Sequence, residues 1–154
     1  MTVVLIDTSV FCNIIGVPEK NQRHEEATGK LGEYIEQEAN LLLPMATILE
    51  TGNHIAHAPR RRHETAERFA EQVRLALDGK APWAVPKLAR EDMRRWIDRF
   101  PREAAKELSL ADLSIIEEWQ RQRDLFQARR VLIWSYDNHL AGRDRPAPAW
   151  TRDQ

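Results

Sequence analysis

The chain has 154 residues, of which 42 % are hydrophobic and 31 % are charged, a composition typical of one globular domain with a sizeable core. A formal net charge of −1 excludes a global attraction to nucleic acid, although local arginine clusters remain. We expect a cytoplasmic protein with no membrane partner. No apolar run approaches the roughly 18 residues of a membrane span, no signal-peptide pattern opens the chain, and a single cysteine excludes an intrachain disulfide framework.

The first dozen residues predict a buried strand that leads into a helix. Val3–Ile6 is an apolar run rich in β-branched residues, as in strands buried on both faces of a parallel sheet. Thr8 and Ser9 are good N-caps for a helix over 10–15. Within that helix, Cys12 is expected to pack as a small hydrophobic residue.

Beyond a break at 16–18, short apolar runs alternate with amphipathic segments. In chain order, we expect a helix at 21–39, a strand at 40–43, helices at 45–57 and 63–78, an edge strand at 83–86, helices at 90–100 and 109–123, a strand at 130–135 and a tail. This alternation predicts a single α/β domain around a mostly parallel sheet.

Helical spacing also predicts which side chains face the core. Ile35, Leu49 and Leu77 fall on the inward faces of their helices, and the same spacing turns Glu50 away from the core. Pro101 is expected to end the helix that precedes it, because proline disrupts a helix interior.

Two acids follow predicted strands. Asp7 comes directly after the first strand, and Asp137 comes shortly after the strand at 130–135. Open α/β sheets bind their ligands beyond the carboxyl ends of the strands, so both positions favour a functional site. The structural alternatives are an N-cap for Asp7 and a turn or cap for Asp137.

Two further acids lie on predicted helices. Glu50 alone is compatible with an ordinary solvent-facing glutamate. Asp112 begins a helical row that continues with Ile115, Ile116 and Trp119, and an acid at the start of an apolar row needs a partner or a metal where it is buried. The alternative for Asp112 is a capping box with a serine three residues earlier.

Together, these four acids predict a metal site at one edge of the sheet. Carboxylates held close together repel one another, and protonation or a bound cation relieves that repulsion. Oxygen ligands favour Mg²⁺ or Mn²⁺ over zinc. A carboxylate cluster with such ions can hydrolyse phosphodiesters, because the metal activates water and stabilises charge on the phosphate.

The order and spacing of these motifs resemble the PIN-domain nucleases and, within them, the VapC-type toxins of bacterial toxin–antitoxin pairs. The resemblance covers about residues 2–142. It rests on Asp7-Thr8-Ser9 after the first strand, Glu50 on the second helical unit, Leu110-Ala111-Asp112 at a helix start, and Ser135-x-Asp137-x-His139-Leu140 after a strand. One departure is that 141–154 has no apolar run where the family usually has a further strand.

The resemblance implies a three-layer α/β/α domain over 1–142, with a short, mostly parallel sheet of four or five strands, and a tail over 143–154. It implies a Mg²⁺- or Mn²⁺-dependent endoribonuclease that acts on RNA, is inhibited by a cognate antitoxin and forms a homodimer. The expected catalytic residues and metal ligands are Asp7, Glu50, Asp112 and Asp137, supported by the hydroxyls of Thr8 and Ser135.

Other interpretations stay open. Asp7 could instead carry an aspartyl phosphate, although Ser9 stands where such phosphatases have a second acid. The domain could also be a non-catalytic interaction module. A zinc site at His54 and His57 lacks a third ligand at matching spacing. Among the basic clusters, Arg60, Arg61 and Arg62 are the candidates to contact RNA phosphates.

Overall fold

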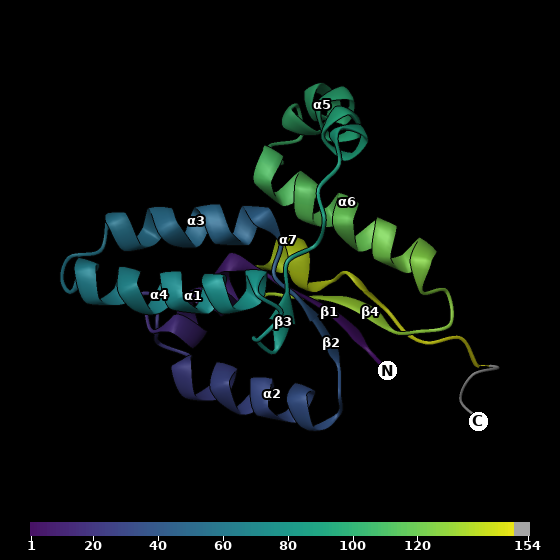
Figure 1. Cartoon of the computed structure of the whole chain (residues 1–154). Helices are drawn as coiled ribbons and strands as arrows, with labels where there is room; N and C mark the ends of the chain where they lie inside the picture. Colours follow the sequence, from purple (N-terminus) through teal and green to yellow (C-terminus); the bar gives the residue numbers. More distant parts are fainter. Residues whose placement is uncertain (150–154) are drawn as a thin grey trace.

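The fold is a five-stranded sheet with helices on both faces, in a computed structural model that describes residues 1–149 (Figure 1). The strand order is β3-β2-β1-β4-β5. The strands are β1 (Val3–Ile6), β2 (Asn40–Leu42), β3 (Trp83–Ala84), β4 (Val131–Trp134) and β5 (Asp144–Arg145). Only the β4–β5 pair is antiparallel. This arrangement confirms the predicted α/β fold and its mostly parallel sheet.

Seven helices surround the sheet in residues 1–149. They are α1 (Thr8–Ile15), α2 (His24–Glu36), α3 (Met45–Ala56), α4 (Arg62–Leu77), α5 (Arg90–Ala104), α6 (Leu110–Leu125) and α7 (Asn138–Ala141). None of them is both long and apolar enough to cross a membrane.

The central strand β1 separates two apolar cores. Successive side chains of a strand point to opposite faces, and here Val4 and Ile6 pack with α1–α4 while Val3 and Leu5 pack with α6 and α7. All four side chains are fully buried, which explains why the run is apolar at every position. Because β1, β2 and β4 are parallel, their carboxyl ends lie at the same edge of the sheet.

The inward faces of three helices differ from the prediction. Ile35, Leu49 and Leu77 are exposed, Leu49 by 63 %. On α3, the fully buried positions are instead Thr47 and Thr51, and Thr47 Oγ1 donates a 2.7 Å hydrogen bond to the Ile6 carbonyl oxygen at the end of β1. Thr47 therefore bonds the end of β1, whereas Leu49, which was expected to face inward, lies at the surface.

Pro101 does not end α5, which continues to Ala104. The Arg99 guanidinium lies 3.4 Å from the Glu103 carboxylate, so an ion pair links the turns on either side of the proline. The prediction that Pro101 closes this helix was therefore wrong.

A fifth strand lies within the segment 143–154, where a tail is expected. β5 pairs with β4 at Val131 and Leu132. The Arg130 guanidinium donates to both carboxylate oxygens of Asp144, at 2.9 and 2.6 Å. The strand is only two residues long, and both residues are charged. The sequence therefore contains no apolar run that would predict it. The end of the predicted tail, 150–154, lies outside the described residues.

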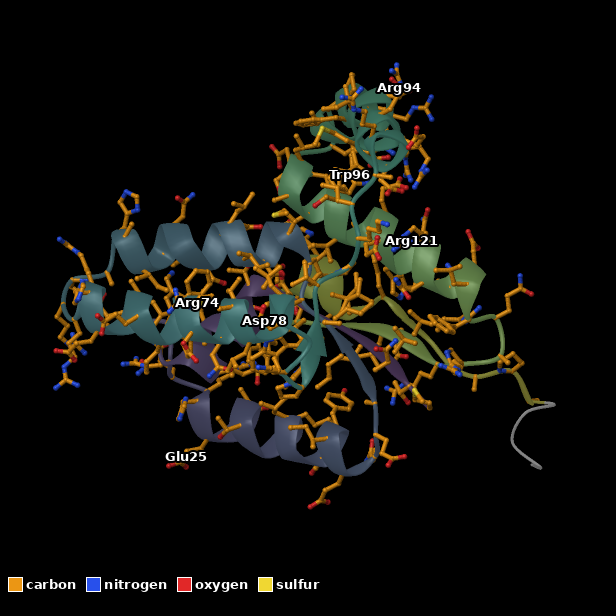
Figure 2. The ribbon with its side chains drawn as sticks, in the orientation of Figure 1. Glu25, Arg74, Asp78, Arg94, Trp96 and Arg121 are labelled. Atoms are coloured by element: carbon orange, nitrogen blue, oxygen red, sulfur yellow. The ribbon has the colours of Figure 1, made fainter. Side chains whose placement is uncertain are left out.

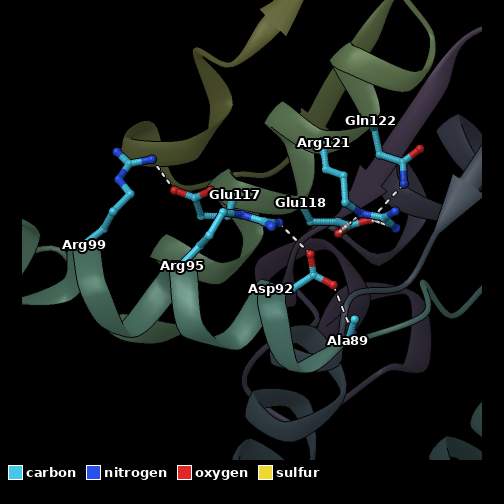
Figure 3. Close-up of polar contacts among 8 residues, drawn as sticks. All are labelled: Ala89, Asp92, Arg95, Arg99, Glu117, Glu118, Arg121 and Gln122. Carbon is cyan, nitrogen blue, oxygen red and sulfur yellow. Dashed lines mark hydrogen bonds and ion pairs between the residues drawn. The ribbon is translucent and has the colours of Figure 1, made fainter.

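Helices α5 and α6 form a hairpin that projects from the sheet layers (Figure 1). Figure 2 shows Trp96 between the two helices. An ion pair between Arg99 of α5 and the buried Glu117 of α6 joins the two helices, and the other polar contacts in Figure 3 lie within one helix or the other. No residue of α5 is fully buried, so this helix depends on α6 for its position.

Candidate active site

Asp7 connects the central strand to the first helix. It follows β1 and is the N-cap of α1, where its side chain accepts from the Ser9 amide at 3.5 Å and from Ser9 Oγ at 2.9 Å. Ser135, which follows β4, donates a further 2.7 Å hydrogen bond to the same Oδ2 atom. Although Asp7 is only 5 % exposed, its carboxylate is held by hydroxyl donors. The N-cap alternative is correct for Asp7 and is compatible with a functional role.

Ser135 also orders the chain that leads to Asp137. Its Oγ accepts a 2.9 Å hydrogen bond from the Asp137 amide, and Ser9 Oγ accepts one of 2.9 Å from the Tyr136 amide. Asp137 is the N-cap of the short helix α7, where Oδ1 accepts from the His139 amide at 2.9 Å. The ends of β1 and β4 are therefore fixed to each other by hydroxyl groups.

Asp112 lies in the first turn of α6. Ser109 Oγ caps this helix by accepting a 3.0 Å hydrogen bond from the Asp112 amide, which is one half of the predicted capping box. Burial raises the pKa of the Asp112 carboxyl, and the carboxylates of Asp7 and Asp137 raise it further. The effect of both acids on Asp112 indicates that the three carboxyl groups face a common space.

Glu50 differs most from its expected surroundings. It is half-buried, and its Oε1 atom is inaccessible and has no hydrogen-bond partner. Burial, followed by the carboxylates of Asp112 and Asp7, raises the pKa of Glu50 to about 7. The interpretation of Glu50 as an ordinary solvent-facing glutamate is therefore wrong.

All four acids line one cavity of about 350 Å³. They come from the β1–α1 junction, α3, α6 and the segment after β4, so residues far apart in the sequence meet at the carboxyl edge of the sheet. Thr8 also lines this cavity, and its Oγ1 is buried without a hydrogen-bond partner. Ser135 does not line the cavity but orients Asp7 through its hydrogen bond to that carboxylate.

The same cavity contains cations that the sequence interpretation missed. Lys20 and Arg23, from the segment between α1 and α2, line it together with the acids. Asn13 fixes this segment: its Oδ1 accepts from the Arg23 amide and its Nδ2 donates to the Ser9 carbonyl oxygen, both at 2.8 Å. The Arg23 guanidinium lies 4.5 Å from the centre of the Tyr136 ring. These contacts span several elements, so residue spacing gave no signal for them.

Two other groups of candidates lie differently. Arg60 and Arg61 line a second cavity, and the Arg62 Nε donates to the Ala58 carbonyl oxygen, so none of the three lines the acidic cavity. His54 lines the acidic cavity, whereas His57 lies outside it with its Nδ1 at 2.9 Å from the Asn53 carbonyl oxygen. The two histidines therefore do not form the centre of a shared site.

The donor chemistry of the cavity fits a hard divalent cation. Its acids supply only oxygen atoms, and the Glu50 carboxyl carries a buried oxygen with no partner in the protein. Burial, followed by repulsion among the carboxylates, raises the pKa of Glu50 and of Asp112, and a cation would relieve the repulsion. Across residues 1–149, no three histidine, cysteine or acidic side chains already lie close enough together to hold a metal ion. A bound ion would therefore have to draw the carboxylates inward.

Comparison of the chain with known protein families, with characterised proteins and with solved structures finds no match. The architecture described above is that of an α/β domain with a mostly parallel five-stranded sheet.

Proposed function

We propose that this chain is a Mg²⁺- or Mn²⁺-dependent endoribonuclease of the PIN type and the toxin of a toxin–antitoxin pair. The observation that carries the proposal is the gathering of Asp7, Glu50, Asp112 and Asp137 around one cavity at the carboxyl edge of a parallel sheet. Each of the four comes from a different element, and an acidic cavity of this kind needs a cation or protons to be stable.

Within this proposal, Asp7 and Asp112 are the principal metal ligands, and Glu50 and Asp137 complete the acidic set. When bound, the metal would lower the pKa of a water molecule and stabilise charge on the phosphate. Ser135 and Ser9 orient the Asp7 carboxylate through their hydroxyl groups. Hydrogen bonds of this kind fix a ligating carboxylate in one orientation.

Lys20 and Arg23 supply the positive charge that an RNA substrate requires. They line the same cavity as the acids, so a phosphodiester could contact both the cations and the carboxylate edge. The net charge of −1 makes such local cations more important, since no global field attracts RNA.

The test is cleavage of a mixture of structured RNAs with Mn²⁺ by the wild-type chain and by Asp7→Asn. Asparagine is also a good N-cap, so the variant should fold. We expect it to lose at least about a hundredfold in activity, the scale of removing a key electrostatic group. The matched control is Asp78→Asn at the C-terminus of α4 (Figure 2), where the same change should leave cleavage intact. Unchanged cleavage by Asp7→Asn would refute the proposal.

The proposed antitoxin would cover the acids with a basic group and place apolar residues beside them. An apolar groove of about 320 Å³, between α3 and the α5–α6 hairpin, shares Glu50 with the acidic cavity. Its exposed wall includes Leu49, Met93 and Ile97. The apolar wall of this groove and the acidic group at Glu50 together fit an amphipathic segment that ends in arginine or lysine. An inhibitory partner that still binds after Leu49→Asp and Ile97→Asp would contradict this placement.

The two alternative functions make different predictions. An aspartyl-phosphate enzyme would trap beryllofluoride on Asp7, whereas a non-catalytic module would bind its partner without metal and cleave no RNA under any condition.

A further inference from the structure

A second cavity, of about 360 Å³, lies where helix α4 begins. Its wall includes Arg60, Arg61 and Thr65 from the start of α4, Arg68 one turn further on, and Gly16 from the end of α1. None of these residues belongs to the acidic cavity. The connection between α1 and α2 contributes residues to both cavities.

Three arginines line this cavity without a carboxylate partner. Within residues 1–149, none of Arg60, Arg61 and Arg68 forms an ion pair with an acid. Arg68 is oriented by the Ile15 carbonyl oxygen, to which its Nη2 and Nε donate at 3.2 and 3.4 Å. Three like charges around one space, with no counter-charge from the protein, favour an anion as their partner.

The wall of the cavity also contains an unsatisfied hydroxyl. Thr65 is 0 % exposed, and its Oγ1 has no hydrogen-bond partner in the protein. A buried hydroxyl without a partner is costly, and most such groups in folded proteins are satisfied. An oxygen atom of a ligand in the cavity would satisfy it.

The N-terminus of α4 also favours an anion in this cavity. No side chain caps the N-terminus of α4, although the helix has 16 residues. Its first amide groups therefore lack the acceptor that a capping side chain would supply, and the helix dipole favours negative charge at that end.

We propose that this cavity binds a phosphate group. A phosphate presents several acceptor oxygens at once, which suits three guanidinium groups, a buried hydroxyl and a helix N-terminus better than a single planar carboxylate does. The favoured source is the backbone of a polynucleotide, because the segment 16–23 contributes Lys20 and Arg23 to the acidic cavity and Gly16, Pro18 and Asn21 to this one. Naming a polynucleotide rests on the proposed ribonuclease function; the phosphate site itself does not.

Two probes test the site without requiring cleavage. Inorganic phosphate is titrated calorimetrically, and a single-stranded RNA oligonucleotide is titrated by fluorescence anisotropy, both in EDTA and at several salt concentrations. The variants are Arg60→Gln/Arg61→Gln and Thr65→Val. The second keeps the shape and charge of the wall and removes only the unpartnered hydroxyl, so it should fold at least as stably as the wild type. The charge-matched control is Arg74→Gln/Arg94→Gln, on the distal half of α4 and on α5 (Figure 2).

We expect the arginine variant to weaken binding about tenfold, because hydrogen bonds to charged groups are among the strong ones. For RNA, the slope of the logarithm of the binding constant against the logarithm of the salt concentration should become shallower by about 0.7 for each phosphate that the variant no longer neutralises. Thr65→Val should also weaken binding, and the control should bind as the wild type does.

The outcomes separate the possible sources and the two proposals. Weakened binding of RNA alone, or of both probes, supports the site with a polynucleotide as its ligand; weakened binding of phosphate alone supports it with a small phosphate compound. The proposal is overturned if neither probe binds, or if the control variant loses as much binding as the arginine variant does. An inactive protein whose phosphate binding still depends on Arg60 and Arg61 would refute the ribonuclease function and leave this site standing.

Discussion

The hydroxyl of Ser135 donates a 2.7 Å hydrogen bond to Asp7 Oδ2 and so joins two residues that are 128 positions apart in the chain. Because Ser135 follows β4 and Asp7 follows β1, this contact makes the position of the central carboxylate depend on the register of two parallel strands. The arrangement of the acids at the carboxyl edge of the sheet thus depends on how the sheet assembles. Substitutions that each remove one hydroxyl group can test this arrangement.

Replacing Ser135 with alanine should loosen Asp7 without unfolding the protein. One lost hydrogen bond costs about 1 kcal/mol of stability, whereas loss of a group that orients a metal ligand weakens metal affinity by about 10- to 100-fold. The measurement is Mn²⁺ affinity, followed by electron paramagnetic resonance. Ser114→Ala is the matched control, since Ser114 is equally buried, at 9 % exposure, and bonds only to the local Ala111 carbonyl oxygen. Equal affinity in the two variants would show that Ser135 is structural only.

Millimolar Mn²⁺ should raise the melting temperature of the wild type but not of Asp7→Asn/Asp112→Asn. At a hundredfold excess over the Kd, a ligand adds about 2.7 kcal/mol. For a chain of this size that corresponds to roughly 5–10 °C, at about 2–4 °C per kcal/mol. The double variant should melt higher than the metal-free wild type, because it removes two mutually repelling charges. If Mn²⁺ shifts both proteins equally, or neither, the acids do not form a metal site.

Metal-free protein should lose stability as the pH rises from about 4.5 to about 7. The pKa of Glu50 is raised to about 7 from its ordinary value of 4.5, so the folded state binds more protons than the unfolded state within that window. The free energy of unfolding therefore falls with pH there and remains lower above pH 7. Chemical denaturation in EDTA at pH 5 and pH 8 measures the difference.

Glu50→Gln should flatten that pH dependence, since glutamine does not ionise and preserves the shape of the side chain. The exposed Glu64→Gln on α4 is the control and should retain the wild-type slope. An unchanged slope in Glu50→Gln would assign the pH dependence to other groups.

The sequence was most informative where local pattern and topology agree. Four apolar residues at 3–6 predict a strand buried on both faces, and the shared carboxyl edge of parallel strands then predicts that Asp7 and Asp137 lie close together. Glu50 lines the same cavity as the other three acids, although helical spacing turns it away from the core. Periodicity measures apolarity, and α3 contacts the sheet through Thr47 instead.

Other features depend on contacts that no local pattern contains. Lys20 and Arg23 share a cavity with the acids, and Asn13 holds their segment by hydrogen bonds to the backbone on either side. β5 is stabilised by backbone pairing and by the Arg130–Asp144 ion pair, neither of which produces an apolar run. Arg60 and Arg61 were noticed as a charged cluster, but the buried Thr65 that defines their cavity is visible only once α4 has packed.

The only cysteine should resist alkylation in the folded protein. Burial raises the pKa of the Cys12 thiol to about 11, and the thiolate is the reactive form. At pH 8, iodoacetamide should therefore modify Cys12 only after unfolding in urea. Mass spectrometry of the native and denatured protein measures this directly. Rapid labelling of the native protein would mean that α1 opens locally and exposes the wall of the acidic cavity.

The ion pairs of the α5–α6 hairpin differ in burial, and their contributions to stability should differ accordingly (Figure 3). Glu117 is only 7 % exposed and is paired with Arg99, so Arg99→Met leaves a buried carboxylate without its partner. Because Arg99 itself is half exposed, we expect a loss of about 1–2 kcal/mol in the free energy of unfolding, below the cost of breaking a fully buried pair.

Arg95→Met is the matched control, because Arg95 pairs with Asp92 on the same helix at the surface and Asp92 keeps its 2.9 Å hydrogen bond from the Ala89 amide. It should cost less than about 1 kcal/mol. Arg99→Met/Glu117→Met should recover most of the loss, since apolar residues of similar volume replace such pairs well. Urea denaturation measures all three. Equal losses for Arg95→Met and Arg99→Met would show that burial of Glu117 does not govern the stability of the hairpin.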